Sequence, residues 1–141
     1  MNIHSTPQLT PAETALIKAF GDRLTLLPGD GDVMLKRDNA IETLKAGLPT
    51  RRIESWHYTD LRRLLTSVPE FDAALEAKTV APLVEGSPVL PVLNGVAGKP
   101  VAIEGVTTTP VSAKLADGTY APALGAQGAD DAIGALNTAF V

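Results

Sequence analysis

The stretch TPAETALIKAFGDRLTLL, residues 10–27, predicts the helix from which the fold is built. Thr10 is a favourable N-cap, Pro11 loses no hydrogen bond at the first helical position, and Glu13 can reach back to the cap amide. Apolar residues recur at three- and four-residue steps, which predicts a stripe along one helix face. This stripe consists of Leu9, Ala12, Leu16, Phe20, Leu24 and Leu27. The turn-forming residues 28–32, Pro-Gly-Asp-Gly-Asp, end the helix.

Three more helical signals follow in the first half of the chain. An amphipathic stretch over residues 34–48 meets a stop at Gly47 and Pro49. A third helix is expected to start at Thr59-Asp60, and residues 67–70 repeat the capping-box pattern before a short fourth one. The side chains expected to face the core are Met34, Ile41, Leu44, Leu48, Leu61, Leu64, Leu65, Phe71, Ala74 and Leu75. Together these signals predict a helical cluster over roughly residues 8–78.

The pattern of the sequence changes after Lys78, from helical periodicity to short apolar runs. Residues 89–93 and 101–103 are apolar runs that predict two strands on either side of the hairpin dipeptide Asn94-Gly95. Residues 106–115 are a possible further strand, interrupted by Pro110. A last helix near 129–139 is expected to begin at Asp130-Asp131 and to bury Ile133, Leu136 and Phe140.

These elements predict an α+β fold, in which an N-terminal helical cluster precedes a small antiparallel β region, about residues 88–115, and a C-terminal helix. We expect two parts: a helical subdomain over residues 1–80, and a small β region with the terminal helix over residues 81–141. A chain of 141 residues is long enough for one ordinary domain with a core of its own.

Composition excludes several classes of function. The chain has no cysteine and two histidines, so disulfides, thiolate catalysis, Cys-ligated zinc and a histidine-rich metal site are not expected. Its net charge is −4, yet residues 36–63 hold seven Lys/Arg against four Asp/Glu, which makes that segment +3. Only this segment is expected to attract an acidic partner. With no signal peptide and no long apolar run, we expect a soluble, cytoplasmic protein.

Tests for known catalytic and ligand-binding motifs are negative. Asp30 and Asp32 resemble the start of a calcium loop, but apolar residues occupy the later ligand positions. Residues 95–100 have two glycines too close together for a phosphate loop, and Pro100 stands where Ser or Thr must bind magnesium. No serine-hydrolase elbow is present. We therefore predict no catalytic, cofactor-binding or metal-binding residue, and a protein that is not an enzyme.

One constellation stands out, in the segment from Arg51 to Arg63. It combines arginines with the only tryptophan, a histidine and a tyrosine: Arg51, Arg52, Trp56, His57, Tyr58, Arg62 and Arg63. One interpretation is a patch that binds anions or single-stranded nucleic acid, with arginines on phosphates and aromatic rings stacking on bases. The other interpretation is structural: Trp56 anchors the core, Glu54 pairs with an arginine and Tyr58 finds a buried partner. Extended chain here would place Arg52, Glu54, Trp56 and Tyr58 on one side.

The string GLPTRRIESWHYTDL, residues 47–61, resembles the Gly-x-Pro-Thr-Arg-Arg-x-Glu-x-Trp-Lys-Tyr-Thr-Asp-Leu segment of the SufB/SufD family of iron–sulfur cluster assembly proteins. The resemblance is closest to the N-terminal region of the SufD branch. Weaker echoes follow in residues 93–95 and 135–140. The sequence departs from the family pattern at His57, where the family usually carries Lys or Arg.

The resemblance implies a non-catalytic scaffold subunit of the SufBCD complex, with SufB-like and SufC-like subunits as partners through the full-length protein. Family chains continue into a parallel β-helix, so we expect this chain to be an N-terminal portion that leads towards it. No cofactor is implied for this portion. As candidate docking or structural residues we name Arg51, Arg52, Glu54, Trp56, His57, Tyr58 and Asp60, with an acidic partner for the arginines. The competing prediction is the nucleic-acid or anion-binding module, and neither prediction involves a membrane.

Overall fold

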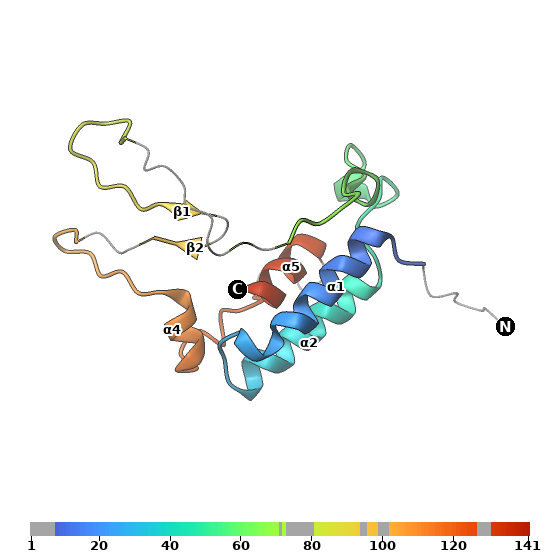
Figure 1. The fold of residues 1–141 in the computed structure, drawn as a ribbon, viewed down its shortest axis with the longest axis horizontal. Coiled ribbons are helices and arrows are strands. Elements are labelled where there is room, and N and C mark those ends of the chain that lie inside the picture. Colours follow the sequence, from blue (N-terminus) through green and yellow to red (C-terminus); the bar gives the residue numbers. More distant parts are fainter. Residues whose placement is uncertain (1–7, 71, 73–80, 94–95, 99–101, 127–130) are drawn as a thin grey trace. The chain divides into compact units, whose positions relative to one another are not determined.

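The computed structural model describes residues 8–70, 72, 81–93, 96–98, 102–126 and 131–141 (Figure 1). The α-helices are α1 (Pro11–Arg23), α2 (Gly31–Lys45), α3 (Leu61–Leu64), α4 (Val111–Ala116) and α5 (Ala132–Phe140). Two 3₁₀ turns are η1 (Leu24–Leu26) and η2 (Glu54–Trp56), and two strands are β1 (Val92–Leu93) and β2 (Val96–Ala97). The chain divides into two units: residues up to Val68 with Val111–Val141, and Pro69–Pro110.

The predicted α+β class is wrong. Helices hold 46% of the described residues and strands 4%, and the β region reduces to one antiparallel hairpin and an isolated bridge between Ile103 and Val106. The apolar runs are too short and too often broken to build a sheet. Pro91, which has no N–H to donate to a ladder, directly precedes β1.

The hairpin pairs Val92 with Ala97 and Leu93 with Val96. This register leaves only residues 94 and 95 between the strands, as a two-residue hairpin connection requires, and those two residues lie outside the described ones. The sequence had placed the second strand later, at residues 101–103. The unit Pro69–Pro110 contributes no residue to either hydrophobic cluster of the described chain.

The start of α1 confirms its predicted local chemistry. The side chain of Thr10 accepts a hydrogen bond from the backbone N–H of Glu13 at 3.2 Å, and the Glu13 carboxylate accepts one from the N–H of Thr10 at 2.6 Å. These two bonds satisfy two of the amides that a helix start leaves unpaired. Ala12 and Phe20 of the predicted stripe are buried, and Leu16, Leu24 and Leu27 pack against the same cluster.

The main core forms where α1 and α5 both pack on α2, as Figure 1 shows within this unit. The buried members of this core are Phe20, Ala40, Ile41, Leu44, Leu48, Ala135 and Ala139. The rings of Phe20 and Phe140 meet edge to face with centroids 6.1 Å apart, a favourable aromatic geometry. A second cluster joins Val33 of α2 to Leu115, Ala121 and Leu124.

Arg37 lies inside this unit, on the buried face of α2. Its guanidinium donates to the backbone carbonyls of Ala139 at 2.9 Å and Thr138 at 3.4 Å, and to that of Pro28 at 2.8 Å. The first two carbonyls belong to the last turn of α5, where a cation is favoured. Its Nε has no hydrogen-bond partner, and burial lowers the pKa of this guanidinium. Arg37 thus fastens α5 to α2.

Three further sequence expectations about the helices differ from the fold. Residues 111–116 form α4 rather than a strand, because Pro110 precedes a helix whose Leu115 is fully buried. In α5 the predicted Leu136 and Phe140 pack against the main core, but Ile133 is exposed, and the buried positions are Ala135, Thr138 and Ala139. Residues 67–70 are not helical, and the rest of the predicted fourth helix falls largely outside the described residues.

The division into a helical subdomain over residues 1–80 and a second part over residues 81–141 stays a prediction. No helix in the described part of the chain is both long and apolar enough to cross a membrane.

Candidate docking surface on residues 49–65

The arginines and aromatic residues singled out above lie on a loop whose two ends are hydrogen-bonded to each other. We call this loop, with the α3 turn that follows it, the 49–65 segment. It begins after Gly47, whose φ of +100° favours glycine, and after the buried Leu48. The carbonyl of Pro49 accepts a hydrogen bond from the N–H of Leu61 at 3.1 Å. That bond joins the entry of the loop to the first residue of α3.

Glu13 is the group that ties this loop to α1. As a whole residue, Glu13 is only 2% exposed. Its carboxylate accepts a hydrogen bond from the backbone N–H of Leu48 at 2.7 Å and lies 3.2 Å from Nε of Arg62. Burial by itself would raise the pKa of Glu13, but hydrogen bonds from Thr10 and Leu48, with the charge of Arg62, hold that pKa below its usual value. Glu13 is therefore an ionised anchor beneath the 49–65 segment.

Inside the loop the backbone turns instead of extending. The N–H of Trp56 donates to the carbonyl of Ile53 at 2.8 Å, and the N–H of Thr59 donates to that of Trp56 at 2.8 Å. With η2 at Glu54–Trp56, the interpretation as extended chain with Arg52, Glu54, Trp56 and Tyr58 on one side is wrong. The physical reason is that successive turn hydrogen bonds satisfy backbone groups which a lone strand would leave unpaired.

At the end of the loop, α3 confirms the predicted helix start. The carboxylate of Asp60 accepts the N–H of Arg63 at 3.0 Å, as an N-cap does. Leu61 and Leu65 pack against the main core, whereas Leu64 is 68% exposed. The α3 turn therefore fixes the segment to the core through two leucines and presents the third to solvent.

Most of the candidate residues present their side chains to solvent. Arg51, Arg52, Glu54, His57 and Tyr58 are exposed, while Trp56 and Asp60 are half-buried. Tyr58 is 86% exposed, so it has no buried position. Among the described residues the ion pairs do not include Glu54 with an arginine. The structural interpretation, which expected Glu54 to pair with an arginine and Tyr58 to have a buried partner, is thus not met for these two residues.

His57 and Tyr58 form an exposed aromatic pair. Their ring centroids are 3.7 Å apart with planes inclined at 46°, and Nδ1 of His57 lies 2.7 Å from the carbonyl oxygen of Glu54. These contacts hold both rings at the surface of the loop.

A hollow of about 310 Å³ opens beside this pair, and we call it the arginine–tyrosine pocket. Its walls are Arg51, Tyr58, Asp60, Arg63 and Leu64. The sequence pointed to Arg51, Tyr58 and Asp60 as candidates and noted Arg63, but it expected Leu64 to face the core. The sequence did not reveal that Glu13 contacts this loop. The hydrogen bond from the N–H of Leu48 to the Glu13 carboxylate spans 35 residues, whereas the sequence shows only the local capping box.

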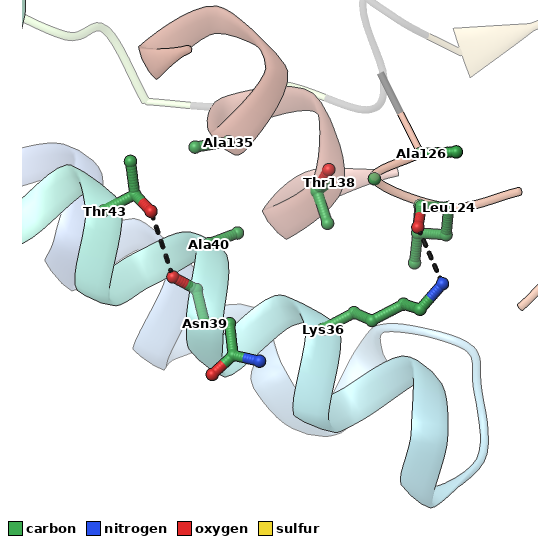
Figure 2. A pocket seen from close by; sticks show the side chains of 9 residues that line it. Lys36, Asn39, Ala40, Thr43, Leu124, Ala126, Ala135 and Thr138 are labelled. Carbon is green, nitrogen blue, oxygen red and sulfur yellow. Dashed lines mark hydrogen bonds between the residues drawn. The ribbon is translucent and has the colours of Figure 1, made fainter. Parts of the chain in front are cut away.

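A second hollow, of about 250 Å³, lies between α2, α5 and residues 124–126 (Figure 2). Small side chains dominate its walls, among them Ala40, Ala126 and Ala135. The ammonium of Lys36, which reaches across it, donates to the carbonyls of Ala121 and Leu124. This cation is engaged by backbone, so we regard the hollow as a packing feature.

In the part of the chain that the structure describes, no group of three or more His, Cys, Asp or Glu side chains could hold a metal ion. No family model, curated protein or solved structure matches the chain.

Proposed function

We propose that this chain is the N-terminal domain of a SufD-like scaffold subunit, cytoplasmic and non-catalytic, which docks an acidic partner of iron–sulfur cluster assembly through the 49–65 segment. The sequence resemblance over residues 47–61 supports the family. The observation that supports docking is the exposure of Arg51, Arg52 and Tyr58 on a loop anchored from beneath by Glu13. SufB-like and SufC-like subunits are the partners to be tested.

The composition of the exposed surface favours a protein partner over nucleic acid. Ile53 is 49% exposed and Leu64 is 68% exposed, so aliphatic area accompanies the arginines. The exposed Tyr58 suits either partner, because its ring can also stack on a base. Protein interfaces are enriched in tyrosine, tryptophan and arginine and contain apolar area at their centre. Phosphate contacts instead use cationic and polar groups and gain nothing from exposed aliphatic side chains.

The experiment compares capture of purified SufB-like and SufC-like subunits by the wild-type chain and by an Arg51→Ala/Arg52→Ala variant. Both arginines are exposed, so we expect an unchanged melting temperature and a severalfold loss of capture. A Lys18→Ala/Lys45→Ala variant removes the same charge from exposed helix positions of the same unit and is expected to leave capture unchanged.

Three outcomes would count against the proposal. Equal capture by all three proteins would show that the arginines dock nothing, and loss of capture only together with a large fall in melting temperature would return them to a structural role. Salt-sensitive retention on heparin, with binding of a single-stranded oligonucleotide and none of the subunits, would establish the nucleic-acid alternative.

A further inference from the structure

The arginine–tyrosine pocket combines two guanidinium groups with one carboxylate. Arg51 and Arg63 are exposed cations on its wall, and Asp60 is the single anion. An oxygen of Asp60 accepts the backbone N–H of Arg63 at 3.0 Å, so that carboxylate is partly engaged by the loop itself. In the described chain neither arginine side chain forms an ion pair. The pocket therefore has an excess of one positive charge.

This charge matches a carboxylate better than a phosphate. A guanidinium group binds a carboxylate through two parallel N–H···O bonds, and one incoming carboxylate would neutralise the excess charge. A phosphate monoester carries nearly two negative charges at neutral pH and would meet the carboxylate of Asp60 in the same hollow. Asp60 thus selects for the anion of lower charge.

The other walls are apolar and open to solvent. Leu64 is 68% exposed and Tyr58 is 86% exposed, and both border the same hollow as the arginines. Covering such area removes apolar surface from water, which favours a ligand with an apolar side chain beside its carboxylate. From these observations we infer that the arginine–tyrosine pocket binds a protein segment in which a Glu or Asp side chain neighbours a bulky apolar one. This inference rests on the proposed function, because it names the partner chemistry of the same docking segment.

The test measures fluorescence anisotropy of a labelled short peptide of alternating leucine and glutamate, with the 141-residue chain as receptor. The Arg63→Gln variant keeps the backbone N–H that Asp60 accepts, so its melting temperature should not change, and we expect about tenfold weaker binding. A Leu64→Ser variant should lose severalfold. The Lys45→Gln control removes a cation from an exposed position of α2 and should bind as the wild type does.

Two matched peptides decide the chemistry. Replacing glutamate by glutamine should abolish binding, and replacing it by phosphoserine should weaken binding. Equal affinity for the glutamine peptide, tighter binding of the phosphoserine peptide, or tighter binding of a single-stranded oligonucleotide would each overturn the inference. No Suf subunit is present in this assay: peptide binding without subunit capture would refute the scaffold proposal alone, and capture without peptide binding would refute the pocket alone.

Discussion

Replacing Glu13 by glutamine tests the anchor beneath the 49–65 segment. The carboxylate accepts the N–H groups of Thr10 and Leu48 at 2.6 and 2.7 Å and pairs with Arg62 at 3.2 Å. Glutamine has nearly the same volume, but its amide offers one oxygen and one NH₂. At least one of the two backbone donors then faces another donor.

The expected loss of stability is about 3 kcal/mol. A buried donor left without its acceptor costs about 1–3 kcal/mol, and losing the charge that pairs with the 28%-exposed Arg62 side chain adds about 1 kcal/mol. For a domain of about this size, that corresponds to a fall in Tm of roughly 10 °C. The loss should spread to the 49–65 segment, because Leu48 directly precedes that segment and Arg62 lies within it.

Thermal and urea unfolding followed by circular dichroism measures this change, and hydrogen exchange at Leu48 locates it. The control is Glu42→Gln, which alters an exposed carboxylate of α2 that pairs with Lys45 and should change stability by less than about 0.5 kcal/mol. If Glu13→Gln also costs less than about 1 kcal/mol, or leaves the exchange of Leu48 unchanged, the anchor role assigned to Glu13 is refuted.

Two further predictions concern the buried charges. The folded-state pKa of Glu13 lies below its unfolded value, so its contribution to stability is present above about pH 4.3 and is lost as the pH falls through the folded pKa. The difference in unfolding free energy between the wild type and Glu13→Gln should therefore narrow in an acid titration. A difference that stays constant with pH would contradict this. Arg37→Ala should cost about 3 kcal/mol or more, since it leaves a cavity and unpaired carbonyls at Pro28 and Ala139. Hydrogen exchange should then show loss of protection in α5 first, and a cost under about 1 kcal/mol would disprove the fastening role.

Local chemistry made parts of the fold predictable from sequence. The caps at Thr10, Asp60 and Asp131 each join a side chain to a backbone amide three residues away, so a few consecutive residues determine them. The stripe around Phe20 was equally readable, because helical periodicity alone places it on one face.

The sequence predictions fail where contacts between residues far apart in the chain determine the structure. A helical stripe does not predict a buried arginine. Arg37 is stable there because its guanidinium donates hydrogen bonds to the carbonyl of Pro28 and to two carbonyls of α5, about 100 residues later. Residues 106–115 were a possible strand by sequence, but residues 111–116 form α4, in which Leu115 packs against the distant Val33 in the second cluster. Within the candidate site, the side chains of residues 51–58 could be named from sequence, but whether they faced solvent depended on the turns that close the loop.

The unit formed by residues up to Val68 and from Val111 onward is discontinuous in sequence. Its α5 packs on α2, so the chain leaves this unit and returns to it across the whole Pro69–Pro110 segment. The entropy of closing such a connection grows only with the logarithm of its length, and a twofold change in length alters the cost by about 0.6 kcal/mol. Insertions and deletions between Val68 and Val111 can therefore accumulate with little penalty for the helical core, which leaves the intervening segment open to change independently of it.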